Sequence, residues 1–102
     1  MIRVIAVATL KEGKRKNYLE EVYKIMPLVH IEDGCIEYGP HIDMDSGIPI
    51  QKKLGPDTVA IIERWESLEA LKKHGMTPHM NNFRRAVKTF MQSMQLLVLT
   101  PA

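Results

Sequence analysis

The stretch from Ile61 to Phe83 constrains the fold more than any other part of the chain, because it carries the clearest boundaries between elements. β-branched and small apolar residues fill Val59–Ile62, which is the composition of a buried strand. Ser67 is a good N-cap for a following helix, and Gly75 is a natural end for that helix. Thr77–Pro78 then predicts the start of a second helix, with Thr at the N-cap and Pro at the first helical position. We therefore expect a strand, a helix, a break and a second helix, in that order.

Hydrophobic spacing and turn residues predict the remaining elements. Before the central stretch we expect a strand at Ile2–Thr9, a helix at Lys14–Val29 and a second strand at Cys35–His41. An irregular excursion follows at Pro40–Asp57, and the last strand is expected at Gln95–Leu99. Pro27 lies inside the first helix and is expected to kink it or to end it early. The last helix is expected to continue to Met94, because apolar residues keep helical spacing up to that point. The excursion is long for a compact domain, so we expect it to be functional or part of an interface.

The element order β-α-β-β-α-β, with the second helix split in two, predicts a ferredoxin-like α+β fold with an antiparallel sheet and its helices on one face. The chain has 102 residues and no repeat or break in composition, so we expect a single domain over residues 1–102. Three of the four strands are apolar on both faces, as Leu96–Leu99 illustrates. A strand that is apolar on both faces needs cover on both, and two-fold dimers are the commonest assembly. We therefore expect a homodimer.

Composition and charge exclude several classes of protein. A formal net charge of +2, with Lys and Arg spread along the chain, gives no basic face for nucleic acid. No run approaches the ~20 apolar residues of a membrane span, and no signal-like segment is present. The single Cys cannot form an internal disulfide, so a reducing, cytoplasmic setting is expected. The sequence has no Gly-rich phosphate loop, no C-x-x-C and no dinucleotide fingerprint, so we expect no bound cofactor.

Four side chains of the central stretch are expected to line a cavity between the sheet and the helices. Strand alternation places Glu63 and Trp65 on one face of their strand. His74 ends one helix and His79 begins the next, so both could reach the same cavity. Acid–base catalysis by the histidines is the functional interpretation, and two satisfied structural histidines are the alternative. A zinc site would need a third ligand nearby, so we expect no metal.

The other candidate side chains have structural alternatives of their own. Trp65 is either a core residue or a wall for a flat aromatic substrate, and Tyr38 either packs on the sheet or points its hydroxyl into the cavity. Glu63 is expected to form an ion pair, or else to orient a histidine. Its candidate partners are the arginines Arg64, Arg84 and Arg85, including Arg64 from across a dimer. Phe83 and Met76 are expected to add an adaptable apolar lining.

Several short motifs together resemble a known family. The pattern Glu-x-Trp-Glu-Ser at 63–67, followed by Ala-Leu-x-x-His-x-x-Thr-Pro-His at 70–79, resembles the antibiotic biosynthesis monooxygenase family. Its quinol monooxygenase branch is similar at three further places: Asp33-Gly34-Cys35 with Tyr38 and Pro40, Pro56-Asp57, and Ala86-Val87-Lys88. The resemblance covers nearly the whole chain. It implies a dimeric α+β barrel in which Trp65 packs against an aromatic substrate.

The resemblance implies a cofactor-independent monooxygenase that oxidises a quinol or a related phenolic aromatic with O₂. A deprotonated hydroquinone is electron-rich enough to reduce O₂ directly, so the protein needs a base, a flat apolar slot and exclusion of water. The candidate catalytic residues are His74 and His79. The candidate substrate-binding residues are Trp65, Tyr38, Phe83, Glu63 and Met76.

Three other functions remain open from the sequence. An isomerase of small hydroxy-ketones on the same fold would use the same pair of histidines, although the aromatic residues favour a quinol. Haem-binding relatives resemble the chain at Trp65, but they carry an Asn in the first strand and a His in the last helix. The corresponding positions here are Val7 and Arg84, so haem binding is disfavoured. A dimeric protein without catalysis is the third alternative.

Overall fold

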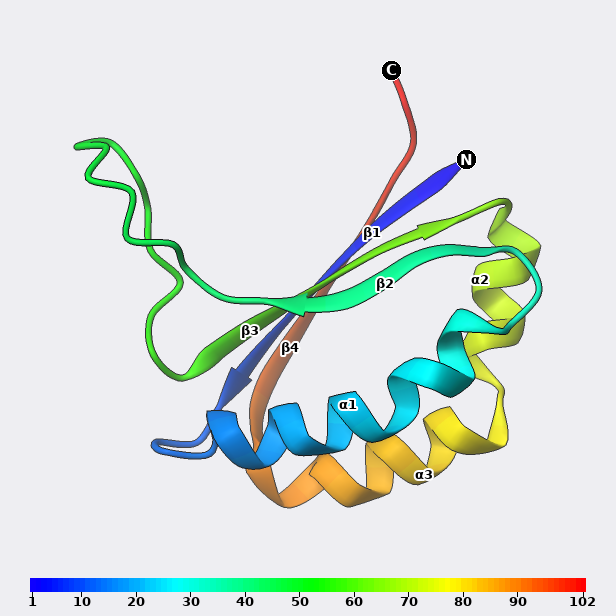
Figure 1. Cartoon of the computed structure of the whole chain (residues 1–102), viewed down its shortest axis with the longest axis horizontal. Coiled ribbons are helices and arrows are strands. Elements are labelled where there is room, and N and C mark those ends of the chain that lie inside the picture. Colours follow the sequence, from blue (N-terminus) through cyan, green and yellow to red (C-terminus); the bar gives the residue numbers. More distant parts are fainter.

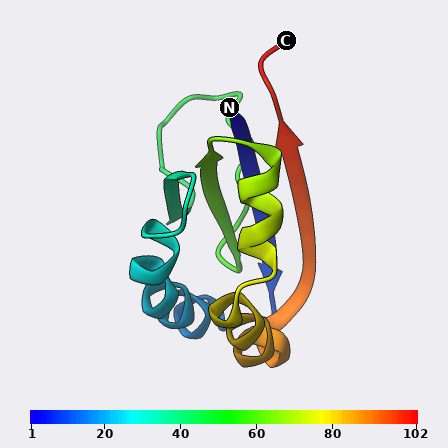
Figure 2. The same ribbon diagram turned by 90° about the vertical axis from the view of Figure 1, so that its right-hand side faces the viewer.

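The computed structural model describes residues 1–102 and contains four strands, three α-helices and one short 3₁₀-helix (Figure 1). In chain order they are β1 (Ile2–Leu10), α1 (Arg15–His30), β2 (Cys35–His41), β3 (Thr58–Trp65), α2 (Leu68–Gly75), α3 (Pro78–Val87), the 3₁₀-helix η1 (Lys88–Phe90) and β4 (Met91–Leu99). The strands form one antiparallel sheet in the order β2-β3-β1-β4. The helices lie on one side of this sheet (Figures 1 and 2). This is the ferredoxin-like α+β fold that the element order predicted.

The core forms where alternate residues of the strands meet the apolar side of α1. In β1 the buried residues follow strand alternation, from Val4 to Leu10 at every second position. In β3 the side that carries Val59 and Trp65 is buried. α1 presents four buried residues at helical spacing: Tyr18, Val22, Ile25 and Val29. Both strand periodicities and the apolar side of the helix agree with the sequence prediction.

One helix boundary is confirmed and another is wrong. α1 runs from Arg15 to His30, close to the predicted Lys14–Val29, and does not end early at Pro27. The buried Ile25 and Val29 on either side of Pro27 both contribute to the core, which favours a continuous helix there. The last helix does not reach Met94, because α3 ends at Val87 and β4 begins at Met91. In the β1–β4 ladder Met94 pairs with Ala8, so backbone pairing with β1 prevails over the helical spacing of the apolar residues.

The edge strand β4 and the long excursion carry exposed apolar side chains. All four residues from Leu96 to Leu99 in β4 are exposed by 46–61%. The excursion between β2 and β3 has no regular strand or helix, and projects from the body of the molecule (Figure 1). Its base is closed by Asp43, which accepts hydrogen bonds from the backbone N–H groups of Leu54 and Gly55 at 2.9 and 2.8 Å. These bonds also lower the pKa of Asp43. None of the helices combines the length and apolar character needed to cross a bilayer.

Candidate active site

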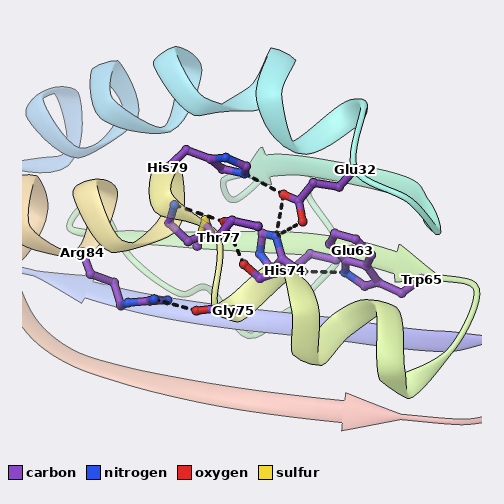
Figure 3. Close-up of polar contacts among 9 residues, drawn as sticks. Glu32, Glu63, Trp65, His74, Gly75, Thr77, His79 and Arg84 are labelled. Carbon is purple, nitrogen blue, oxygen red and sulfur yellow. Dashed lines mark hydrogen bonds and ion pairs between the residues drawn. The ribbon is translucent and has the colours of Figure 1, made fainter.

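The corner between α2 and α3 positions both candidate histidines. Ser67 caps α2 by accepting a hydrogen bond of 3.1 Å from the N–H of Ala70, as predicted. Thr77 caps α3, and its hydroxyl also donates a bond of 2.9 Å to the carbonyl of His74 (Figure 3). Arg84 donates to the carbonyl of Gly75 at 2.6 Å and ties α3 to the end of α2. The corner is therefore fixed on both sides, which holds His74 and His79 in one relative orientation.

Glu32, just beyond the end of α1, joins the two histidines (Figure 3). Nδ1 of His74 lies 2.9 Å from Oε2 of Glu32 and 3.2 Å from Oε1. Nε2 of His79 lies 2.7 Å from the same Oε2 atom. The exposed fractions of the side chains are 6% for His74, 12% for Glu32 and 18% for His79. A single, largely buried carboxylate therefore contacts both imidazoles.

Trp65 and Tyr38 place aromatic rings against His74. The ring centroids of Trp65 and His74 are 4.6 Å apart with an interplanar angle of 38°, and those of Tyr38 and His74 are 5.5 Å apart. Trp65 is completely buried and Tyr38 is 5% exposed. Burial, followed by the nearby Glu63 carboxylate, raises the pKa of Tyr38, so its hydroxyl stays protonated. His74 is thus enclosed by two aromatic rings on one side and a carboxylate on the other.

Glu63 pairs with Trp65 and not with an arginine of the same chain. The indole Nε1–H of Trp65 donates a hydrogen bond of 2.8 Å to Oε1 of Glu63. The predicted ion pair is wrong within the chain, because Arg64 contacts Glu37 at 3.1 Å and Arg84 binds the carbonyl of Gly75. Burial raises the pKa of Glu63, while the bond from Trp65 and the nearby His74 act in the opposite direction. The strand places Arg64 on the other face of the sheet, which is why it does not reach Glu63.

Of the two predicted apolar lining residues, Phe83 is buried and Met76 is exposed. Phe83 is 7% exposed and packs edge-on against Tyr18, with ring centroids 5.7 Å apart. Together with His79 it lines a cavity of about 240 Å³ between α1 and α3. The other lining residues are Glu21, Lys24, Ile25, Leu28, Asn82 and Ala86. Met76 follows α2 and is 71% exposed, so the structure places it on the surface and not in the enclosed centre.

Glu32 is the residue that the sequence analysis did not find. It lies 42 residues before His74 and 47 before His79, so no local pattern connects the three. Its one available signal is its position directly before Asp33-Gly34-Cys35, the motif that carries part of the family resemblance. Gly34 has a φ of +83°, which turns the chain from α1 into β2 and leaves Glu32 facing α2. No group of three or more His, Cys, Asp or Glu residues is arranged to hold a metal ion.

The fold and the enclosed pair of histidines define a class of protein: a small ferredoxin-like α+β protein with two histidines on one largely buried carboxylate. The chain belongs to the antibiotic biosynthesis monooxygenase family, whose model matches residues 1–86. It is 37% identical over 103 residues to the protein described as "Probable quinol monooxygenase YgiN" from Escherichia coli K12. This match covers 99% of the chain and 98% of YgiN, and the YgiN of Shigella flexneri matches equally well.

Solved structures of lower sequence identity share the fold. PA3566 from Pseudomonas aeruginosa superposes with a TM-score of 0.80 at 23% identity, covering 99% of this chain and 93% of that one. Rv0793 from Mycobacterium tuberculosis gives a TM-score of 0.80 at 24% identity, covering 99% of this chain and 94% of that one. At these identities the likeness supports the fold alone. The ferredoxin-like architecture is thus common to the chain and to these distant relatives.

Proposed function

We propose that this protein is a cofactor-independent monooxygenase that oxidises a quinol or a related phenolic aromatic with O₂. The observation that carries the proposal is the contact of His74 with the rings of Trp65 and Tyr38, with Glu32 at its Nδ1 atom. Membership of the monooxygenase family and the likeness to a probable quinol monooxygenase support the reaction class. The geometry and the family thus support the same chemistry.

In the proposed reaction His74 acts as the base. It takes the proton of a substrate hydroxyl, and the electron-rich phenolate that remains passes electrons to O₂. Burial of His74 and its neighbours keeps water away from the reacting centre, which strengthens electrostatic interactions there. Trp65 and Tyr38 provide flat surfaces for the substrate ring. Because Trp65 is completely buried and the His74 ring lies against it, a substrate reaches the indole only when side chains around the indole rearrange.

The remaining candidate residues have secondary roles in the proposal. Glu63 holds the indole of Trp65 through the bond of 2.8 Å and so fixes the plane of that ring. His79 and Phe83 lie between the enclosed centre and the cavity at α1 and α3, on the path that a substrate would follow. Met76, which follows α2 and is exposed, adds apolar contact area on the surface beside this corner. The substrate and O₂ are the only small-molecule partners proposed, and a metal or bound cofactor forms no part of the reaction.

A homodimer in the cytoplasm completes the proposal. Leu97 and Leu99 of β4 pair with Ile5 and Arg3, so they lie on the side of the sheet that faces away from the helices, and both are 47% exposed. The excursion adds further exposed apolar side chains, among them Ile48 at 60% and Ile50 at 92%. An apolar surface of this kind favours association with a second copy of the chain. The one free thiol, Cys35, is compatible with a reducing compartment.

The test is oxygen uptake by purified protein, freed of metal and flavin, on a panel of reduced quinones. His74→Gln removes the base and keeps polarity and approximate size, so it should lower the rate by at least ~10²-fold, the lower end for a general base. His41→Gln is the matched control, because His41 is exposed at the end of β2. Oxidation by the His74→Gln variant at the parental rate would make His74 structural. Absence of oxygen uptake by the parent on every quinol would reject the proposed function, and isomerisation of a hydroxy-ketone would then be measured instead.

A further inference from the structure

The contact between Glu32 and the two histidines defines which nitrogen of each ring carries a proton. An ionised carboxylate accepts hydrogen bonds and donates none. Nδ1 of His74 and Nε2 of His79 both lie within hydrogen-bond distance of Glu32, so both of these nitrogens must donate. In a neutral imidazole only one nitrogen is protonated. The opposite nitrogens, Nε2 of His74 and Nδ1 of His79, are therefore left with free lone pairs.

The two histidines are not equivalent around the shared carboxylate. His74 faces both oxygens of Glu32 and contacts the rings of Trp65 and Tyr38. Its side chain is 6% exposed, and Nε2 has no hydrogen-bond partner within the protein. His79 faces a single oxygen, is 18% exposed and lines the outer cavity between α1 and α3. The enclosed ring with the free Nε2 atom is the one suited to remove a proton from a substrate in a dry site.

Glu32 is itself held in place by its own backbone. Its N–H donates to the carbonyl of Val29 at 3.0 Å, and its carbonyl accepts from the N–H of Cys35 at 3.1 Å. These bonds, with the turn at Gly34, fix the residue between α1 and β2. The other carboxylate near the centre, Glu63, is occupied by the indole of Trp65. Two carboxylates thus lie near His74. Glu32, just beyond α1, contacts the histidines, and Glu63, in β3, binds the indole of Trp65.

We propose that Glu32 is a positioning residue that holds His74 in the tautomer protonated at Nδ1, so that Nε2 is the base, and that His79 anchors Glu32 and is not itself the base. That the proton comes from a substrate hydroxyl rests on the proposed function. The assignment of the two histidine tautomers does not rest on it. In the transfer the substrate O–H bond breaks, its electron pair stays on the phenolate oxygen, and a new N–H bond forms at Nε2. The resulting imidazolium keeps its Nδ1–H on the Glu32 carboxylate, which stabilises the added positive charge.

The first test needs no enzymatic activity. Long-range ¹H–¹⁵N NMR correlations on the parent, labelled at histidine and measured where both rings are neutral, report which nitrogen is protonated. We expect His74 to carry its proton on Nδ1 and His79 on Nε2. A neutral His74 with its proton on Nε2 would overturn the inference. Because this measurement uses the parent alone, it decides the matter even if a Glu32 variant fails to fold.

The second test removes the acceptor altogether by Glu32→Leu, because the amide oxygen of a glutamine has two lone pairs and could still accept from both imidazoles. Leucine accepts no hydrogen bond, so at least one of the two histidines should change tautomer. Glu20→Leu, at an exposed position of α1, is the matched control and should leave both unchanged. Parental tautomers at both rings in Glu32→Leu would overturn the inference.

The third test separates the roles of the histidines by kinetics. If Glu32 positions the base, Glu32→Gln should lower kcat by about 10- to 100-fold with a much smaller change in KM, as for other partners that orient a histidine. His79→Gln keeps an N–H donor for Glu32, whereas His79→Leu does not, so kcat should fall further in the Leu variant. An equal fall of kcat in His79→Gln and His79→Leu, with a parental kcat in His74→Gln, would make His79 the base and overturn the inference. If the parent oxidises no quinol, the proposed function fails, while the NMR result on Glu32 stands.

Discussion

The indole of Trp65 donates its Nε1–H to Oε1 of Glu63 at 2.8 Å, so a buried carboxylate is satisfied by the residue two positions further along the same strand. Residues i and i+2 of a strand lie on the same face, which allows this contact. Glu63 is 5% exposed and Trp65 is completely buried. Burial of the carboxylate outweighs this hydrogen bond and raises the pKa of Glu63 above its ordinary value of 4.5. Ionised Glu63 is therefore a source of instability in the folded state at neutral pH.

Glu63→Gln should stabilise the fold at neutral pH. The folded parent binds the Glu63 proton more tightly than the unfolded chain does, so its stability falls as pH rises from about 4.5 through the raised pKa. A glutamine oxygen can still accept from Trp65, and the side chain stays neutral throughout. Urea unfolding of parent and variant between pH 4 and pH 8 measures the difference. It should be small at pH 4 and should favour the variant above the titration window.

The exposed Glu20 provides the comparison for this prediction. Glu20→Gln removes the same charge from an exposed position of α1 and should not reproduce the pH-dependent gain. A Glu63→Gln variant that is less stable than the parent at pH 7 would show that ionised Glu63 contributes favourably, through His74 or Trp65. The pH dependence then has to be assigned to another buried group.

Gly34→Ala should destabilise the fold and disturb the histidine centre. Gly34 has a φ of +83°, and an added Cβ would lie 2.6 Å from Cβ of Ala70 in α2. The variant therefore combines a strained backbone with a clash, and should lose more than about 1 kcal/mol of unfolding free energy. Gly13→Ala is a matched control, since Gly13 has a φ of +76° and nothing within 4 Å of an added Cβ.

The difference between the two glycine variants isolates the clash with α2. Urea unfolding should rank Gly34→Ala well below Gly13→Ala in stability. Because Gly34 follows Glu32 by two residues, Gly34→Ala should also shift the NMR signals of His74. Equal losses of stability in the two variants would mean that the chain near Ala70 relaxes without cost.

Cys35 should react slowly with alkylating reagents in the folded protein. Burial, followed by the carboxylates of Glu32 and Glu63, raises the pKa of the Cys35 thiol to about 11. The thiolate is the reactive form, so alkylation by iodoacetamide at pH 8 should be more than about 100-fold slower than for a free cysteine. Unfolding in urea should restore the ordinary rate. A fast reaction in the folded state would mean that the thiol is accessible as its thiolate.

The sequence predicted the elements whose signals are local. Strand alternation identified the buried side of β3, and the caps at Ser67 and Thr77 identified the starts of α2 and α3, as the structure confirms. The end of α3 was wrong, because the residues around Met94 satisfy helical spacing in the sequence but pair with β1 in space. Propensity and periodicity describe a segment alone, while a strand needs the partner that the fold brings beside it.

The dependence on partners that only the fold brings together also explains why Glu32 was missed beside the two histidines. His74 and His79 were found because they lie five residues apart beside two recognisable caps. Glu32 was not found, because its contact with them depends on a turn at Gly34 and on the packing of α1 beside α2 and α3. A buried histidine near a family motif predicts that a polar partner exists. It does not predict which of the twelve acidic residues that partner is.

Dimerisation should depend on the side of the sheet that faces away from the helices. Leu97 pairs with Ile5 in the β1–β4 ladder, lies on that side, and is 47% exposed. A lysine at this position stays solvated in a monomer, but would be an unpaired charge in an apolar interface. Sedimentation should therefore give about twice 11.7 kDa for the parent at micromolar concentration and 11.7 kDa for Leu97→Lys. Leu68→Lys, at a residue 46% exposed at the start of α2, is the control and should remain a dimer. A parent that sediments at 11.7 kDa would reject the dimer, and a dimeric Leu97→Lys variant would place the interface elsewhere.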